Sequence, residues 1–150
     1  MKIILLDLNA TYVENTHIHN LRYGQYNVAE EYYRSWLTAR IKGYHVIMIT
    51  ARPERYRKET LQRIEKLENW LPTQHFFNDS GLKAPDFKDM ILRTKVFPDH
   101  GKHLGEKGTR YIALESNSAT SAMYERHGIP AYTQEQFRAD SSILEPMTLL

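Results

Sequence analysis

The chain of 150 residues contains no cysteine. Disulfide bonds, thiolate catalysis and zinc sites with cysteine ligands are therefore excluded. An excess of one charge is also lacking, because 20 lysines and arginines balance 18 aspartates and glutamates and leave a formal net charge of +2. A charge this small neither implies nor excludes a nucleic-acid partner. Long apolar runs are missing as well, so we expect no membrane span, no signal peptide and a cytoplasmic location.

The composition that remains is sufficient for one hydrophobic core. Hydrophobic residues make up 41% of the chain and charged residues 25%, which is ordinary for a soluble globular domain. A length of 150 residues suits a single domain. We find no internal repeat and no linker. We therefore assign one domain to residues 1–138 and a C-terminal tail to residues 139–150.

Short apolar runs alternate along the chain with segments of helical periodicity. The expected strands cover residues 2–6, 45–50, 74–78, 110–114 and 130–133. The expected helices cover residues 28–40, 52–71, 86–92 and 118–127. Residues 12–27 show no period and are interpreted as an irregular excursion, and residues 98–108 as a polar loop. The alternation predicts an α/β fold of three layers, in which helices cover both faces of a parallel sheet.

Three of the apolar runs end in polar side chains. These are Asp7, Asn9 and Thr11 after the first run, Thr50 and Arg52 after the second, and Glu115, Ser116 and Asn117 after residues 110–114. The carboxyl ends of parallel strands meet at one edge of a sheet, so we expect these groups to converge there. Two carboxylates with main-chain carbonyls suit Mg²⁺. A hydroxyl beside an arginine or a lysine suits a phosphate group.

The sequence DLNAT at residues 7–11 is similar to the D-x-D-x-T signature of phosphatases of the haloacid dehalogenase (HAD) superfamily. One position departs, because Asn9 replaces the second aspartate. The resemblance extends over residues 2–134 and implies a HAD-like, Rossmann-like domain with a minimal cap. It implies Mg²⁺ as the cofactor and a phosphomonoester as the substrate.

The resemblance also implies a role for single residues. Asp7 is the expected nucleophile, which forms an aspartyl phosphate, and Asn9 stands at the position of the general acid/base. The Mg²⁺ ligands implied are Asp7, the main-chain carbonyl of Asn9, and Glu115. The phosphoryl group is expected to contact Thr50 and Lys88, with Lys83 as the alternative to Lys88. Further substrate contacts are expected from Thr11, Arg52, Ser116 and Asn117.

Within the superfamily, the stretches ITARPE and IALESNSATSAMYERHGI most resemble the phosphatase domain of polynucleotide kinase/phosphatase repair enzymes. In that domain the last of these strands runs into an Asp-Asp pair, whereas this chain has Glu115 and Ser116. A nearly uncapped site is open and suits a large substrate. The resemblance therefore implies a phosphorylated nucleotide or polynucleotide end as the partner. Tyr12, Tyr23 and Tyr26 are candidates for base stacking, or they simply cover the sheet edge.

Asn9 weakens the catalytic prediction, because an amide has no proton to exchange at neutral pH. The loss of a positioned acid/base typically costs ~10²–10⁴-fold in rate. Three explanations stay open: His17, His19 or Glu14 supplies the proton, or the chain keeps binding without catalysis, or Asn9 is a laboratory substitution. The matching functions are a weakened phosphohydrolase, or a pseudoenzyme that binds a phosphorylated ligand or protein. A third alternative is a lyase or transferase of atypical chemistry.

Overall fold

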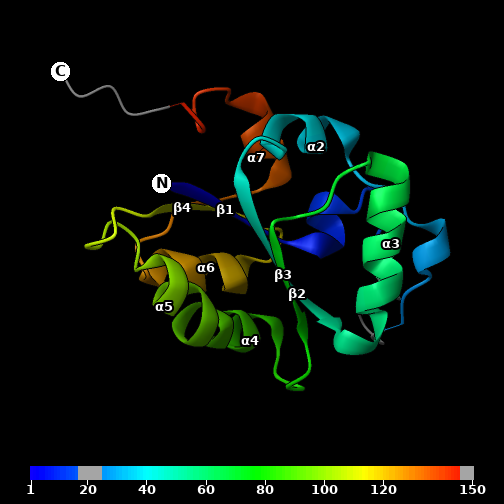
Figure 1. Ribbon diagram of the computed structural model, residues 1–150, viewed down its shortest axis with the longest axis horizontal. Coiled ribbons are helices and arrows are strands. Elements are labelled where there is room, and N and C mark those ends of the chain that lie inside the picture. The colour runs from blue at the N-terminus through cyan, green and yellow to red at the C-terminus, as the bar shows by residue number, and fades with distance from the viewer. Residues whose placement is uncertain (17–24, 146–150) are drawn as a thin grey trace.

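The computed structural model describes residues 1–16 and 25–145. Its centre is a sheet of five parallel strands in the order β3-β2-β1-β4-β5 (Figure 1). The strands are β1 (Lys2–Leu6), β2 (His45–Pro53), β3 (Gln74–Asn78), β4 (Arg110–Leu114) and β5 (Ala131–Tyr132). Every expected strand is present, and the predicted three-layer, Rossmann-like α/β fold is confirmed.

Helices cover both faces of this sheet. The helices are α2 (Ser35–Ile41), α3 (Arg57–Glu68), α4 (Ala84–Ile91), α5 (Phe97–His100), α6 (Ser118–Arg126) and α7 (Gln134–Ala139). Single turns form η1 (Leu8–Tyr12), η2 (Val28–Glu30), η3 (Glu54–Tyr56) and η4 (Leu92–Val96). In Figure 1, α2, α3 and α7 lie on one side of the strands, and α4, α5 and α6 lie on the other.

The central strand β1 contributes to both halves of the core. Ile4 and Leu6 join the cluster beneath α2, α3 and α7, while Ile3 and Leu5 join the cluster above α4 and α6. All four side chains are essentially inaccessible to solvent, and burial of each contributes about 1.5–3 kcal/mol. Because side chains pack against β1 on both faces, the backbone position of Asp7, the residue that follows it, is fixed.

The helix expected over residues 28–40 is wrong in its first half. Val28–Glu30 forms only the turn η2, and α2 begins at Ser35. In between, Tyr33 pairs antiparallel with Val13, and the main-chain N–H of Arg34 donates to the carbonyl of Tyr12 at 3.0 Å. Backbone pairing with the segment after β1 therefore replaces the helical hydrogen bonds that the apolar spacing predicted.

The helix expected from Arg52 begins late. Strand β2 runs on to Pro53, which pairs with Asn78 of β3 after a register shift. A proline biases the residue before it toward extended backbone, so Arg52 stays in the strand and α3 starts at Arg57. The helix ends at Glu68, earlier than expected, because Asn69 adopts a left-handed conformation.

Two short helices were not expected from the sequence. Helix α5 occupies the start of the predicted polar loop, and α7 follows β5. A capping box begins α7, in which the side chain of Thr133 accepts from the N–H of Gln136. The predicted boundary at residue 138 falls inside α7, and Leu144 beyond it packs against the core. The division into domain and tail stays a prediction.

None of the helices within residues 1–16 and 25–145 combines the length and apolar character that a membrane crossing requires. The cytoplasmic location stays a prediction.

Candidate functional site

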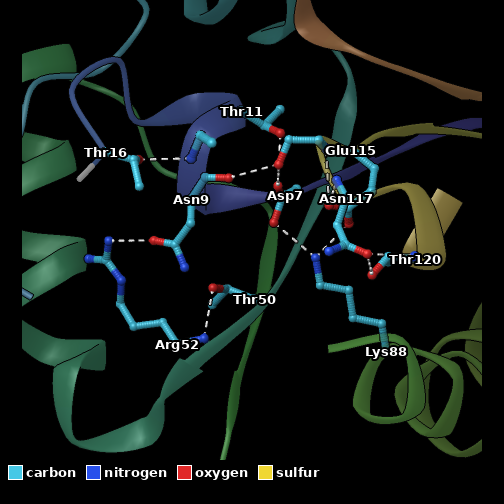
Figure 2. A network of polar contacts seen from close by, with 12 residues as sticks. Asp7, Asn9, Thr11, Thr16, Thr50, Arg52, Lys88, Glu115, Asn117 and Thr120 are labelled. Carbon is cyan, nitrogen blue, oxygen red and sulfur yellow. Dashed lines mark hydrogen bonds and ion pairs between the residues drawn. The ribbon is translucent and has the colours of Figure 1, made fainter. Parts of the chain in front are cut away.

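The candidate site lies at the carboxyl ends of the two central strands (Figure 2). Asp7 follows β1, Glu115 follows β4, and Lys88 enters from α4. The ammonium nitrogen of Lys88 lies 2.9 Å from Oδ1 of Asp7 and 2.6 Å from Oε1 of Glu115. Two carboxylates that are far apart in the sequence thus share one cation. The structure therefore brings together the three charged residues that sequence reasoning assigned to one centre.

This charged centre is buried. Lys88 is 1% exposed, Glu115 2% and Asp7 7%. Burial alone would lower the pKa of Lys88, but the adjacent carboxylates of Asp7 and Glu115 outweigh burial and raise that pKa. Burial and the charge of Asp7 raise the pKa of Glu115, while Lys88 opposes this effect. Lys88 therefore remains a cation at neutral pH, as a group that neutralises a phosphate must.

Two hydroxyl groups hold the second oxygen of Asp7. Oδ2 accepts a hydrogen bond from Oγ1 of Thr11 at 2.8 Å and from Oγ of Ser116 at 3.1 Å. Thr11 is fully buried and does not line the pocket described below. Its observed contact is therefore with Asp7, which it orients, and its expected substrate contact stays a prediction.

The second oxygen of Glu115 faces the start of helix α6. Oε2 accepts from the main-chain N–H of Ser116 at 3.0 Å and of Asn117 at 3.1 Å. The side chain of Asn117 in turn accepts from the N–H of Thr120 and caps α6. These bonds fix the carboxylate of Glu115 relative to the loop that carries Ser116 and Asn117.

Asn9 is placed by an unusual turn after β1. Ala10, the next residue, has a φ of 60° in the left-handed region, which a non-glycine residue adopts only when its surroundings fix it. The N–H of Ala10 donates to Oγ1 of Thr16 at 2.8 Å. The side-chain oxygen of Asn9 accepts from Nη2 of Arg52 at 2.9 Å, and its amide nitrogen donates to the hydroxyl of Tyr26 at 3.4 Å.

Arg52 is fully buried, and Glu31 neutralises it. Its two terminal nitrogens donate to the carboxylate of Glu31 at 2.8 and 2.5 Å, and one of them also donates to Thr60. Its main-chain N–H donates to Oγ1 of Thr50 at 3.1 Å (Figure 2). The expected contact of Arg52 with a phosphate stays a prediction; the observed contact is with Asn9. Glu31 was missed by sequence reasoning, since no motif marks it.

A pocket of about 540 Å³ opens over these groups. Its lining consists of Asp7, Asn9, Ala10, Tyr26, Ala51, Pro53, Ala84, Lys88, Glu115, Ser116 and Asn117. Thr50 is fully buried and is not among the lining residues, so its expected contact with a phosphoryl group stays a prediction. Lys83, the alternative to Lys88, is exposed and lies outside the lining. The geometry thus favours Lys88 as the cation of the pocket.

The oxygen atoms of the pocket suit a hard cation. Oγ of Ser116 contacts both Oδ2 of Asp7 and the main-chain oxygen of Asn9, at 3.1 and 3.2 Å, so these two acceptors face one point. Within residues 1–16 and 25–145, no three His, Cys, Asp or Glu residues are placed to hold a metal together. Mg²⁺ commonly uses only one or two carboxylates and keeps several waters, so this donor set fits Mg²⁺ better than zinc.

The other candidates of the sequence analysis are placed as follows. His17, His19 and Tyr23 lie outside the described residues. Glu14 is exposed and does not line the pocket. Tyr12 is fully buried in the core, so its ring is not available for base stacking. Of the two described tyrosines, Tyr12 and Tyr26, only Tyr26 lines the pocket.

Comparison with known proteins supports the fold. Among the solved structures similar to this chain, one is described as "Structure of Pnkp1/Rnl/Hen1 complex" and another as "Structure of the Pnkp1/Rnl/Hen1 RNA repair complex". The TM-scores are 0.61 and 0.57, with 17% sequence identity in both cases. Each match covers 88% of this chain but only 45% and 42% of the other. At this identity the similarity shows a shared fold, and this chain spans less than half of its neighbours' length.

No protein-family model matches the sequence, and no curated protein matches it.

Proposed function

We propose that the chain is a Mg²⁺-dependent phosphohydrolase of HAD type, which removes a phosphate from a nucleotide or polynucleotide end. The observation that carries this proposal is the position of the Asp7 carboxylate beside Lys88 in the lining of a pocket. A carboxylate nucleophile needs a nearby cation that offsets the negative charge of the phosphate it attacks. Thr11 and Ser116 keep that carboxylate in one orientation.

In the proposed reaction, Asp7, Lys88 and Thr50 have separate roles. Asp7 attacks phosphorus, the ester P–O bond breaks, and an aspartyl phosphate forms while the leaving oxygen departs and takes a proton from solvent. Lys88 neutralises the phosphoryl oxygens during the attack, and the hydroxyl of Thr50, whose oxygen accepts from the N–H of Arg52, would donate its proton to one of them. Water then cleaves the aspartyl phosphate, which releases inorganic phosphate and regenerates Asp7.

Asp7 and the main-chain carbonyl of Asn9 are the residues that would hold Mg²⁺. Glu115 would join them only by exchanging the hydrogen bonds that its two oxygens accept from Lys88 and from the N–H groups of Ser116 and Asn117. The cation supplies Lewis-acid stabilisation of the charge that develops on the phosphoryl oxygens. Lys88 contacts Oδ1 of Asp7 and already supplies one positive charge to that carboxylate.

Asn9 limits the choice of substrate. Its amide cannot protonate the leaving oxygen, so ester bonds with a poor leaving group lose about 10²–10⁴-fold in rate. Esters with an acidic leaving group need less protonation and lose less. We therefore infer slow turnover on alkyl phosphates and faster turnover on aryl phosphates.

A nucleic-acid end is the substrate that the comparisons favour. The two structures named above are both of the Pnkp1/Rnl/Hen1 complex, and one is described as an RNA repair complex. The pocket is also open enough for a substrate larger than a free metabolite, since residues from three strand ends line it without a covering domain among the described residues.

The second candidate is a module that binds a phosphorylated ligand without turnover. The observation that favours it is the contact between Asn9 and Arg52, which stabilises an amide at the position where catalysis needs an acid. In this alternative, Lys88 and Thr50 still hold the phosphate.

The test measures phosphate release with Mg²⁺ from p-nitrophenyl phosphate and from oligoribonucleotides phosphorylated at the 3′ or the 5′ end. Asp7→Asn keeps the shape of the side chain and should abolish release, whereas Asp86→Asn, an exposed residue of α4, should change nothing. Full activity of Asp7→Asn would exclude the proposed mechanism. Thermal stabilisation by the same ligands without any release would favour the binding module.

A further inference from the structure

An aromatic pair extends outward from one wall of the pocket. Tyr26 lines the pocket, and the ring of Tyr56 meets the ring of Tyr26 edge-on, with 5.2 Å between centroids and 79° between planes. Tyr56 belongs to η3, which follows Pro53, another residue of the lining. Both tyrosines are only partly buried. The pair therefore offers aromatic surface directly beside the place where Asp7 and Lys88 receive a phosphate.

The ring of Tyr26 is held in place from two directions. Its hydroxyl accepts from the amide of Asn9, and the guanidinium carbon of Arg52 lies 4.3 Å from its centroid. Arg52 is itself fixed by Glu31 and Thr60. A ring that is already immobile loses little conformational entropy when a ligand stacks on it, so this placement favours binding.

A cation accompanies the outer ring. The guanidinium carbon of Arg55 lies 4.9 Å from the centroid of Tyr56, and Arg55 is exposed. Successive aromatic rings together with arginine are the usual composition of surfaces that bind single-stranded nucleic acid, because every base has a π-face and every linkage carries a negative charge. An aliphatic or sugar phosphate has no group that would use two rings.

We infer that Tyr26 and Tyr56 form a subsite for the nucleobase of the nucleotide whose phosphate lies at Asp7. The inference rests on the proposed function only for the position of that phosphate. The stacked base is the one attached to the phosphorylated ribose, and Arg55 lies beside it, where the next phosphate of a polynucleotide passes. Because stacking does not read base edges, the subsite accepts all four bases with similar affinity.

The test compares Tyr56→Leu with Tyr56→Phe in the full chain. Leucine fills much of the same volume without a π-face, and phenylalanine keeps the ring. Binding is measured by fluorescence anisotropy for two labelled five-nucleotide RNAs with a terminal phosphate. One RNA carries a base on its terminal nucleotide, and the other is abasic at that nucleotide. Ribose 5-phosphate serves as the competitor that lacks a base. Circular dichroism and the Tm confirm that each variant folds.

Tyr56→Leu should weaken binding of the base-bearing RNA about 5- to 100-fold, the range of one lost stacking contact, and Tyr56→Phe should remain within about twofold of the original chain. The abasic RNA should bind the original chain as weakly as the base-bearing RNA binds Tyr56→Leu. Competition by ribose 5-phosphate should be the same in all three proteins.

Equal binding of base-bearing and abasic RNA to the original chain would overturn the subsite. An equal loss of both RNAs in Tyr56→Leu would also overturn it, because the residue would then support the pocket rather than a base. Neither measurement needs turnover, so a chain that releases no phosphate can still confirm the subsite while the proposed hydrolysis fails. A 3′- or 5′-mononucleotide that competes as well as the RNA identifies free nucleotides as the source of the base, and tighter binding of the RNA identifies a polynucleotide end.

Discussion

Nη2 of Arg52 donates a hydrogen bond to the side-chain oxygen of Asn9 at 2.9 Å. Arginine has donors only, so the amide of Asn9 must turn its oxygen toward Arg52 and its nitrogen away. That nitrogen donates to Tyr26 at the pocket wall. Asn9, at the proposed acid/base position, is therefore fixed as a hydrogen-bond donor that cannot release a proton.

Restoring a carboxyl group at position nine should raise activity. Asn9→Asp supplies the missing acid/base, and we expect a gain near the lower end of the ~10²–10⁴-fold range, because the guanidinium of Arg52 lowers the pKa of any carboxyl group beside it. The gain should be larger for alkyl phosphates than for p-nitrophenyl phosphate. Steady-state kcat values on both substrates measure it. An unchanged kcat together with normal stabilisation by Mg²⁺ would contradict the acid/base explanation.

Replacing only one partner of the buried ion pair between Arg52 and Glu31 should strongly lower the free energy of unfolding. Arg52→Met leaves the carboxylate of Glu31 without its main partner and should lower the free energy of unfolding by about 3–5 kcal/mol. Combining it with Glu31→Leu removes both charges and should recover most of that loss. Urea denaturation measures each variant. Arg93→Met, which breaks an exposed pair with Asp89, is the control and should cost less than about 1 kcal/mol. Additive losses in the double variant would show that the two residues are not coupled.

Lys88 should stabilise the fold as well as the site. Lys88→Met leaves Asp7 and Glu115 as neighbouring buried carboxylates, and we expect a loss of about 3–5 kcal/mol at pH 7. Burial and the charge of Asp7 raise the pKa of Glu115, and the variant loses the ammonium that opposes this rise. The folded variant therefore binds more protons than the unfolded chain and becomes more stable as the pH falls from 7 toward 5. Urea denaturation at several pH values tests this, with the exposed Lys83→Met as the control. A variant whose deficit is the same at pH 5 and pH 7 would contradict the proposed charge repulsion.

Tyr111 should make the fold sensitive to alkali. Burial raises the pKa of this phenol from 10.0 to about 12, and its hydroxyl donates to the carbonyl of Gly101 at 2.5 Å. Between pH 10 and 12 the unfolded chain releases the proton while the folded chain keeps it, so stability falls as the pH rises. Tyr111→Phe removes this titrating phenol. The slope of the unfolding free energy against pH should therefore become less steep by up to about 1.4 kcal/mol per pH unit. Guanidinium denaturation across that range measures the slope. Identical slopes would show that Tyr111 already ionises in the folded protein.

The strand ends could be predicted from the sequence because two local signals coincide there. An apolar run such as residues 2–6 predicts a buried strand, and the polar residue after it predicts the site edge. Parallel topology then brings Asp7 and Glu115 together without further information. The structure places Lys88 against both carboxylates and leaves Lys83 exposed outside the pocket, while the contact of Lys88 with a phosphoryl group stays a prediction.

The rest depended on contacts that the sequence does not encode locally. The pairing of Val13 with Tyr33 turns half of an expected helix into extended chain. Glu31 lies in this extended segment, and its contact with Arg52 joins residues 21 positions apart, so no local pattern predicts the ion pair that orients Asn9. Only one weak sequence feature indicated that Tyr56 belongs to the site: it is an aromatic residue soon after the second expected strand. The basic residues around it instead favour a solvent-exposed helix face.

The central place of β1 has a consequence for the growing polypeptide. In the order β3-β2-β1-β4-β5, β1 pairs with β2 on one side and with β4 on the other, and β4 is synthesised about a hundred residues after β1. Until Arg110–Leu114 leave the ribosome, the run of Ile3, Ile4, Leu5 and Leu6 is an unpaired, uncharged edge of the kind that recruits other chains. A fragment that stops before β4 should therefore aggregate, and the growing chain should need a chaperone most until β4 has been made.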